Sequence, residues 1–359
     1  MSQPHAAPDQ HGPDSASPFT ASAHDSGSAH DGGSAHNSVN AHHSASAEAR
    51  SGALFALGLA LKERSYTFTT VTPATHLRVN ARADAQQAKD LAGIFGWNRP
   101  FRAALAGPEV LQAMRDADVV CEQDGSLRSQ VRASTLAGQL YLHSPFPTSA
   151  SDAVFFGPDT YRFVRALRSL LATCGPIARA VDIGCGAGAG ALTIALAHPG
   201  AEVVASDINP AALSATAINA RLASVTNLQT QDSNLLNDIA GSFDLIVSNP
   251  PYLLDRAQRA YRHGGGELGM GLSVDIVEQA LARLSPGGTL LLYTGVAMVD
   301  NADPFHAAVA PLLANARCSW TYEEMDPDVF GEELDEPAYQ QSDRIAAVCL
   351  VASKPHAVL

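Results

Sequence analysis

The sequence has 359 residues, 46% of them hydrophobic, which predicts a globular protein of roughly two domains. Acidic side chains number 36 and basic ones 23, so the formal net charge is -13. Because phosphate contacts supply most non-specific affinity for nucleic acid, this charge argues against a general DNA- or RNA-binding protein. It leaves open a local basic patch.

Two features bear on the compartment. The five cysteines have spacings that fit neither a metal cluster nor a disulfide framework, so we expect free thiols and no metal site. The longest apolar run near the N-terminus, 52–61, is too short to cross a bilayer and lacks a preceding basic region. We therefore expect a cytoplasmic protein that makes no membrane contact.

Residues 1–50 consist mostly of Ser, Ala, His, Asp and Gly, with a repeated Ser-Ala-His-Asp or Ser-Ala-His-Asn unit. Almost nothing large and apolar is available for burial, so this segment is predicted to be a disordered tail. Its histidines raise the hypothesis of a metal-binding tract, but the composition implies no fixed geometry, which favours a solvated tail.

The segment 51–145 is expected to form a second unit, a small α+β substrate-recognition domain. Helical patterns and extended, partly β-branched segments precede two alternating strands around a connection at 133–137, an order typical of a winged-helix-like module. The expected helices are 51–64, 83–95 and 108–117; the expected extended segments are 67–71, 77–80, 127–132 and 138–142. Arg128 and Arg132 alternate along one of these strands and face either a partner or only solvent.

Residues 146–359 predict an α/β domain. A Pro-rich connector containing Phe155-Phe156-Gly157-Pro158 leads into a helix at 161–172. Alternating strands and helices follow, which indicates a parallel sheet covered on both faces, and the last two strands form an antiparallel hairpin. The expected strands are 179–183, 202–206, 228–231, 243–248, 289–294, 319–324 and 344–351; the expected helices are 189–197, 210–223 and 274–284.

A glycine-rich turn follows the first of these strands, with Asp182 ahead of Gly184, Gly186 and Gly188. Glycines permit a tight turn and a close approach of ligand to backbone. The second strand ends at Asp207, where an acid can bind ribose hydroxyls. The third strand ends at Asp232, which either reaches an adenine edge or is a turn residue. A carboxylate at Asp182 would repel a pyrophosphate, so a zwitterionic sulfonium ligand fits better than a dinucleotide.

The segment 243–252 begins as a buried strand and ends in Asn249-Pro250-Pro251-Tyr252. Each proline lacks a backbone N–H, so strand pairing stops at Asn249 and the loop is stiff. Ligands of open α/β sheets bind at the carboxyl ends of the strands. An amide, a stiff loop and an aromatic ring that can stack on a planar group therefore indicate a binding site at this place.

Together these motifs resemble class I S-adenosylmethionine-dependent methyltransferases, and within them the HemK-type family. That family methylates glutamine side-chain amides of release factors and ribosomal proteins. The segments at 157–160 and 264–269 are similar to further motifs of the family. The resemblance implies a Rossmann-like sheet of order 3-2-1-4-5-7-6. It also implies three sets of site residues: catalytic Asn249, Pro250 and Tyr252; cofactor-binding Asp182, Gly184, Gly186, Gly188, Asp207, Ile208, Asp232, Asn249 and Thr160; substrate-binding Asn249, Pro251, Tyr252 and Phe156.

Three departures from the family pattern leave the substrate open. Phe156-Gly157 stands where the family usually has Arg before proline, 292–295 lacks the usual acid, and 326–335 is a strongly acidic insertion. The leading hypothesis is an N-methyltransferase acting on a protein glutamine. The alternatives are an N6-adenine methyltransferase on RNA or DNA and a small-molecule methyltransferase. A binding module with a degenerate pocket and an NAD-linked dehydrogenase are weaker hypotheses.

Overall fold

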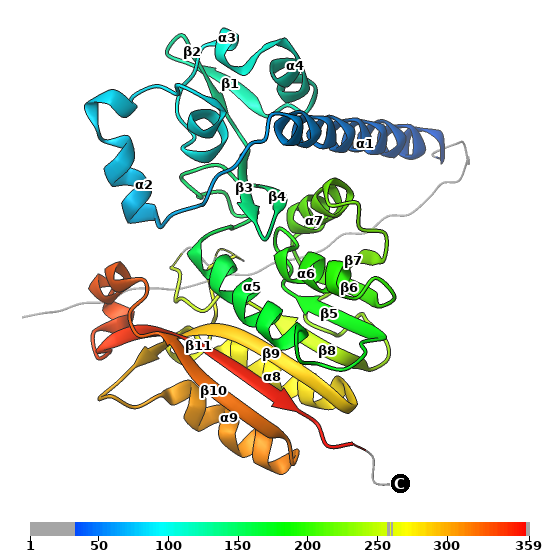
Figure 1. Ribbon diagram of the computed structural model, residues 1–359, viewed down its shortest axis with the longest axis vertical. Coiled ribbons are helices and arrows are strands. Elements are labelled where there is room, and N and C mark those ends of the chain that lie inside the picture. The colour runs from blue at the N-terminus through cyan, green and yellow to red at the C-terminus, as the bar shows by residue number, and fades with distance from the viewer. Residues whose placement is uncertain (1–32, 257–258, 260, 357–359) are drawn as a thin grey trace, which may run out of the picture. The chain divides into compact units, whose positions relative to one another are not determined.

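The computed structural model describes residues 33–256, 259 and 261–356 (Figure 1). The chain divides into two units, Met1–Ala45 and Ser46–Leu359. In the first unit the described backbone, from Gly33 onward, is helical. The contacts reported below belong to the second unit.

Helices and two small hairpins make up the N-terminal part of the second unit. β1 pairs with β2 and β3 pairs with β4, both antiparallel. The elements are α1 Gly33–Glu63, α2 Pro73–Asn80, the 3-10 turn Ala83–Ala85, the π-helical turn Ala92–Gly96, α3 Ala103–Ala106, α4 Pro108–Asp116, β1 Val120–Gln123, β2 Ser126–Ser129, β3 Arg132–Leu136 and β4 Gln139–His143.

A seven-stranded sheet forms the C-terminal part, in the order β10-β11-β9-β8-β5-β6-β7. Read from the other edge, this is the predicted order 3-2-1-4-5-7-6, with β11 antiparallel to both neighbours. The elements are α5 Pro158–Leu171, β5 Arg179–Ile183, α6 Ala189–Ala197, β6 Glu202–Asp207, α7 Pro210–Leu222, β7 Leu228–Asp232, β8 Phe243–Ser248, α8 Gly271–Arg283, β9 Leu284–Met298, α9 Pro304–Asn315, β10 Ser319–Asp326 and β11 Arg344–Ser353, with short 3-10 turns at Glu267–Gly269, Gly331–Asp335 and Pro337–Tyr339.

Helices cover both faces of the sheet. The side chains of each strand point alternately to one face and to the other. In β5, Ala180 joins the core beneath α5, α6 and α7, whereas Val181 joins the core beneath α8 and α9. This double burial explains why the central strands are almost wholly apolar rather than alternating with polar residues. It also leaves the carboxyl ends of β5, β6 and β8 as the edge where polar groups gather.

The N-terminal part packs on α7. Leu57 and Leu61 of α1 share a buried cluster with Ile218 and Leu222 of α7. Between them Asn219, fully buried, accepts the Leu142 N–H at 2.9 Å and donates to the Leu142 carbonyl at 3.1 Å. Its amide also donates to the carbonyl of Ala187, in the glycine loop, at 2.9 Å. One side chain therefore ties β4 to the glycine loop.

Several local predictions were wrong in the N-terminal part. Residues 77–80 are helical, because the Thr72 hydroxyl caps α2 at the Thr75 N–H and Pro73 stands in its first turn. The expected connection at 133–137 is mostly β3. The expected helix at 83–95 is a 3-10 turn and a π-helical turn with irregular chain between them. Arg128 and Arg132 lie on different strands, and Arg132 is 3% exposed.

The predicted disordered tail falls mostly outside the described residues. Residues 33–50 of the predicted tail belong to the helix α1. Adding residues to an existing helix costs far less than starting one, and this stretch is rich in alanine.

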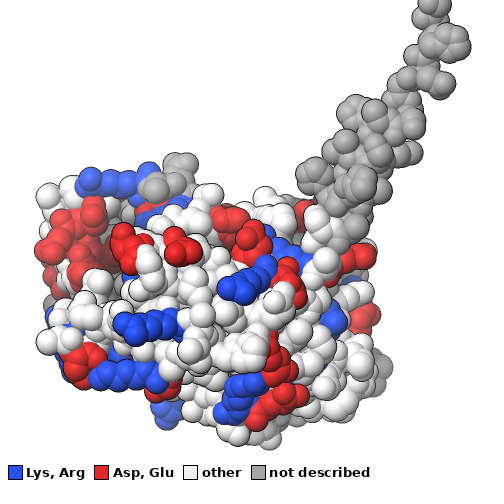
Figure 2. Space-filling model, turned by 90° about the horizontal axis from the view of Figure 1, so that it is seen from above, with Lys and Arg blue, Asp and Glu red and all other residues white. Residues whose placement is uncertain are grey.

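On the face seen in Figure 2, acidic and basic side chains are interspersed among uncharged ones.

Candidate functional site

A cavity of about 430 Å³ lies at the carboxyl ends of β5, β6 and β8. Most of the predicted site residues line it: Asp182, Gly184, Gly186, Asp207, Ile208, Asn249, Pro250, Pro251, Tyr252, Thr160 and Phe156. Gly188 and Asp232 do not. The cavity also reaches residues of the N-terminal part that the sequence did not single out, so it has one wall from each part of the chain.

The glycine loop leaves room for a ligand at two positions. Gly184 and Gly186 have φ of +69° and +53°, and a Cβ at either would meet nothing within 4 Å. These residues therefore present bare backbone to open space. Gly188 differs: with φ of +83°, a Cβ there would lie 2.9 Å from Leu192 and Thr216. Its small size serves the packing of the loop against α6 and α7.

Asp182 is 2% exposed and holds the loop in place. Its Oδ2 accepts the Ala191 N–H at 2.8 Å, in the first turn of α6, where a helix favours negative charge. Burial nevertheless raises the pKa of Asp182 from 3.8 to about 7, with Asp207 adding repulsion. A buried carboxylate next to open loop backbone suits a ligand that brings positive charge.

Asp207 ends β6 and also faces the cavity. Its two oxygens accept the N–H groups of Gly186 at 3.0 Å and Asn209 at 2.9 Å, while burial raises its pKa. The neighbouring Ile208 is 56% exposed, an apolar surface beside the cavity on which a planar ring can rest. Asp232 is the parallel partner of Asp207 but is exposed. The residues after it, 233–235, line the cavity instead.

The segment Asn249–Tyr252 turns away from β8 at the cavity wall. Among the described residues the Asn249 side chain has no hydrogen-bond partner, so its amide is available to a ligand. Tyr252 is 7% exposed and its hydroxyl donates to Asp159 Oδ2 at 2.8 Å. Its ring packs closely on the backbone of Gly295 and meets Phe330 edge-on at 5.8 Å. The predicted stacking role of Tyr252 stays a prediction.

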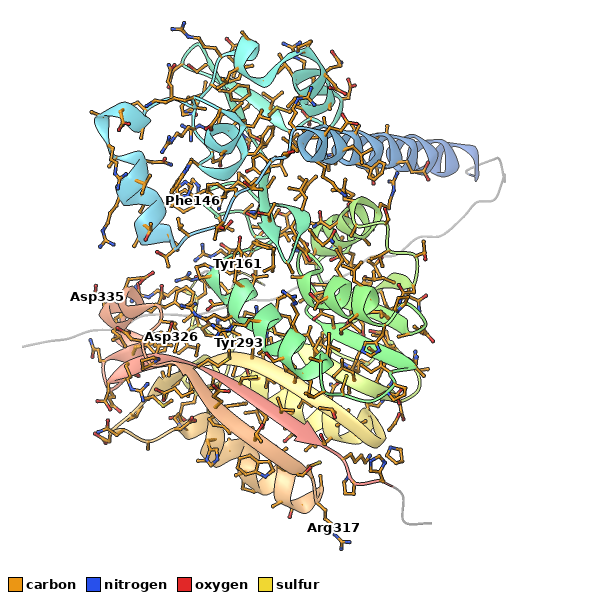
Figure 3. All side chains as sticks on the ribbon, in the orientation of Figure 1. Phe146, Tyr161, Tyr293, Arg317, Asp326 and Asp335 are labelled. Atoms are coloured by element: carbon orange, nitrogen blue, oxygen red, sulfur yellow. The ribbon has the colours of Figure 1, made fainter. Side chains whose placement is uncertain are left out.

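Asp159, which the sequence reasoning gave no role, is the centre of a buried network. It is 3% exposed and accepts hydrogen bonds from the hydroxyls of Tyr252 and Tyr293, each at 2.8 Å, and from Arg162 at 3.1 Å. Burial raises the pKa of Asp159, and the bonds from Tyr293 and Tyr252 oppose that shift. Arg162 continues the network to Asp326 at 2.7 Å, beside Tyr293 in Figure 3. The loop after β8 is thereby fixed to α5 and β9.

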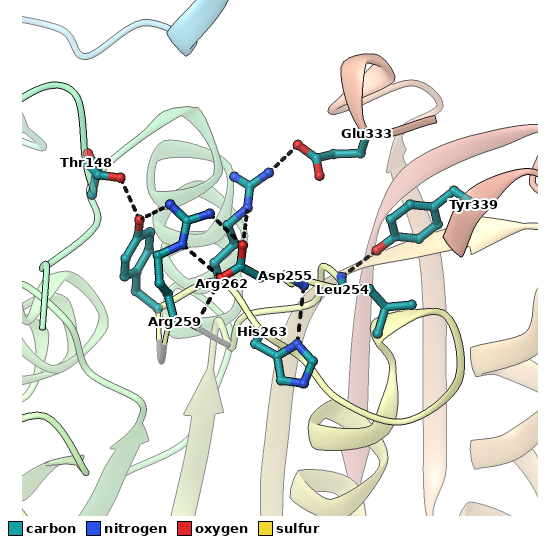
Figure 4. A network of polar contacts seen from close by, with 9 residues as sticks. Thr148, Leu254, Asp255, Arg259, Arg262, His263, Glu333 and Tyr339 are labelled. Carbon is teal, nitrogen blue, oxygen red and sulfur yellow. Dashed lines mark hydrogen bonds and ion pairs between the residues drawn. The ribbon is translucent and has the colours of Figure 1, made fainter. Parts of the chain in front are cut away.

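The acidic segment 326–335 supports the chain that follows Tyr252 (Figure 4). Glu333 pairs with Arg262, and the Tyr339 hydroxyl accepts the Leu254 N–H at 2.7 Å. Arg259 binds Asp255 through both ends of its guanidinium and holds the pKa of Asp255 at about 2. The insertion at 326–335, which has no counterpart in the family pattern, thus contacts the cavity wall through the ion pair of Glu333 with Arg262.

Glycines after this chain allow it to fold back onto Tyr252. A Cβ on Gly269 would lie 2.2 Å from the Tyr252 carbonyl oxygen, and one on Gly264 would lie 2.7 Å from Tyr252 Cα. Both positions exclude any side chain, which gives the glycines of 264–269 a packing role.

Phe156 and Thr160 occupy the connector side of the cavity. Phe156 is 3% exposed and stacks on His143 at 5.0 Å. The Thr160 hydroxyl accepts the Gly157 N–H at 3.3 Å and so shapes the first turn of α5. Both residues line the cavity, as predicted for ligand contact, but both also hold the connector in place.

Residues 164–298 match the family model described as the methyltransferase small domain. The match confirms the predicted HemK-type resemblance, which two curated relatives support. A release factor glutamine methyltransferase of Deinococcus radiodurans is 39% identical over 165 residues, covering 43% of this chain and 55% of the relative. One from Koribacter versatilis is 32% identical over 163 residues, covering 42% and 54%.

The chain thus spans about half the length of these relatives. A third relative is ribosomal RNA small subunit methyltransferase C of Chromohalobacter salexigens. It is 37% identical over 114 residues, covering 32% of this chain and 30% of the relative. Among solved structures, a methyltransferase from Pyrococcus furiosus has a TM-score of 0.38 at 19% identity, covering 54% of this chain and 83% of that one.

Among the described residues, no helix is long and apolar enough to cross a membrane. In the same part of the chain, no three His, Cys, Asp or Glu side chains are grouped so as to hold a metal ion. All five cysteines are free thiols.

Proposed function

We propose that the protein transfers a methyl group from S-adenosylmethionine to the side-chain amide nitrogen of a glutamine in a protein. The observation that carries this proposal is that Asn249–Tyr252 and the glycine loop line one cavity. The similarity of this chain to the release factor glutamine methyltransferases of Deinococcus radiodurans and Koribacter versatilis supports it.

The residues present fit the proposed cofactor. Asp207, Ile208 and Gly184 all line the cavity. Asp207 would bind the ribose hydroxyls, Ile208 would contact one face of the adenine, and the backbone of Gly184 would bind the amino-acid end. When bound, S-adenosylmethionine supplies an electrophilic methyl group on a positively charged sulfur. Asp182 places negative charge near that positive ligand without contacting a pyrophosphate.

The chain's own residues supply positioning and polarisation. An amide nitrogen is a weak nucleophile because its lone pair is delocalised. The Asn249 side-chain oxygen and the Pro250 carbonyl each accept a hydrogen bond from the target NH2, which orients the nitrogen and stabilises the positive charge that develops on it. The network from Asp159 to Tyr252 keeps this loop in one conformation, so the acceptors need no reorganisation.

Substitution of Asn249 tests this assignment. Asn249→Ala should reduce methyl transfer by about 100-fold or more and weaken S-adenosylmethionine binding, measured by calorimetry, far less. Asn315→Ala, at an exposed position at the end of α9, is the matched control. Transfer is measured as tritiated methyl incorporated into a cell lysate. An Asn249→Ala protein that labels the lysate as well as wild type would refute the assignment.

The same labelling separates the second candidate, methylation of adenine in RNA or DNA. That candidate is supported by the ribosomal RNA methyltransferase relative. The net charge of -13 and the interspersed charges of Figure 2 argue against a long polyanionic substrate. Label lost on protease digestion supports the protein substrate; label lost only on nuclease digestion supports the nucleic acid.

A further inference from the structure

The cavity has a second wall from the N-terminal part and the connector, which we call the acceptor wall: Thr70, Val71, Pro73, Arg132, Phe146, Pro147 and Thr148. In Figure 3, Phe146 and Tyr161 lie where the two parts meet. Most of the acceptor wall is apolar. Its charged member is Arg132, from the first position of β3.

Arg132 is a buried cation without a carboxylate partner. It is 3% exposed, and no described acidic side chain lies within ion-pair distance of it. Its Nε donates to the Gly96 carbonyl at 3.0 Å, and its Nη2 reaches the Thr70 hydroxyl at 3.5 Å. The remaining N–H groups, including both on Nη1, have no hydrogen-bond partner among the described residues.

Nη1 is not among the side-chain atoms that are sealed from solvent without a partner, so the unpaired end of the guanidinium is accessible at the cavity. A buried guanidinium is normally paired or fully hydrogen-bonded, because removing a charge from water carries a large penalty. Burial lowers the pKa of Arg132 to about 10, so the group is still protonated at neutral pH. The other cavity-lining arginine, Arg262, is paired with Glu333 and Asp255. A negatively charged group on the molecule that occupies the cavity would give Arg132 the ion-pair partner that Arg262 already has.

The anion belongs to the acceptor rather than the cofactor. Arg132 contacts Gly96 and Thr70, and among the described residues neither of the cofactor-side acids, Asp182 and Asp207, forms an ion pair with it. Thr70, which Arg132 contacts, is held at the acceptor wall by its N–H donating to the Tyr161 hydroxyl at 3.0 Å. A single buried cation in an apolar wall suits one compact anion, whereas a nucleic acid backbone is usually met by several exposed cations.

We propose that Arg132 binds a carboxylate of the acceptor, so that the glutamine to be methylated is presented beside an acidic side chain. This inference rests on the proposed function for the identity of the acceptor. The Arg132 site itself rests on burial, the cavity and the missing partner. A carboxylate matches the planar fork of a guanidinium with two parallel hydrogen bonds.

Paired peptides test the proposal. Each pair has one glutamine and differs only by Asp or Asn at one of the three positions on either side. For at least one position the wild-type chain should methylate the Asp peptide with a kcat/KM at least 10-fold above that of the Asn peptide. Arg132→Met should abolish that preference, Arg132→Lys should retain part of it, and Arg168→Met, an exposed arginine on α5, should leave it unchanged. Equal rates for every pair in the wild type would overturn the proposal.

A binding measurement separates failure of this site from failure of the proposed function. Succinate and its neutral diamide are compared on the full chain by ligand-observed NMR, which needs no turnover. Succinate binding that is lost in Arg132→Met and kept in Arg168→Met supports the anion site even if no peptide is methylated. Succinate binding that is indifferent to Arg132 overturns it, as does a stronger Arg132-dependent response to inorganic phosphate, which would favour a nucleic acid acceptor. Circular dichroism confirms folding, and Arg132→Lys replaces Arg132→Met if the latter does not fold.

Discussion

The buried Asp182 should make the protein less stable as the pH rises. The pKa of this carboxyl is about 7 in the folded chain against 3.8 for an exposed aspartate. The folded state therefore binds the proton more tightly than the unfolded state, and the contribution of the neutral carboxyl to stability is fully present below pH 3.8. It is lost progressively as the pH rises from 3.8 to about 7.

The size of this effect follows from the two pKa values. At 1.36 kcal/mol per unit, the difference corresponds to about 4 kcal/mol of unfolding free energy. Asp182→Asn keeps an oxygen that can accept the Ala191 N–H but never acquires a charge. The variant should therefore gain stability relative to wild type as the pH rises from 4 to 8, approaching about 4 kcal/mol at the upper end.

Urea unfolding at a series of pH values from 4 to 8 measures this difference. Subtracting the wild-type curve from the variant curve removes the titration of other groups. Asn315→Ala, at an exposed position at the end of α9, is the control and should give a flat difference because it changes no titratable group. A flat difference for Asp182→Asn as well would show that Asp182 titrates alike in both states, and the reasoning from its burial would fail.

Three further substitutions test packing and hydrogen bonds by urea unfolding. Gly188→Ala should lower the free energy of unfolding by about 1–3 kcal/mol, because it forces a side chain into a left-handed backbone conformation against α7. Gly200→Ala is the control, since a Cβ at Gly200 meets nothing within 4 Å. Equal losses for the two variants would contradict this reasoning. Tyr293→Phe should cost about 1.5–3 kcal/mol through the lost bond to Asp159, and an unchanged midpoint would show that this bond contributes nothing. Asn219→Leu should cost about 3 kcal/mol or more, since it leaves buried backbone groups unpaired; a loss under 1 kcal/mol would mean that water replaces it.

The sheet could be predicted from the sequence because its signals are local. The apolar run at β8 ends at two prolines, and β5 ends at a glycine loop, so both strand ends and their chemistry are visible in short windows. The helix α9 was missed although Asp303 caps it at the His306 N–H and Pro304 stands in its first turn. That pair of residues is the signal that could have revealed it.

The polar network behind the site could not be predicted in this way. Asp159 meets Tyr252 and Tyr293 at sequence separations of 93 and 134, and no periodicity connects them. The same holds for Arg132. In the sequence it is one of two alternating arginines, and only the pairing of β3 with β4 and the packing around it reveal that it is buried. Contacts of this kind depend on the tertiary fold and not on local pattern.

The position of Asn219 has a consequence for how an acceptor is chosen. A rotation of the N-terminal part away from the glycine loop would break buried hydrogen bonds to both Leu142 and Ala187 at once. The spacing between the cofactor side and the acceptor wall is therefore set before any substrate arrives. Under the proposed function, this fixed spacing selects acceptors in which the NH2 group and the recognised carboxylate are separated by a matching length.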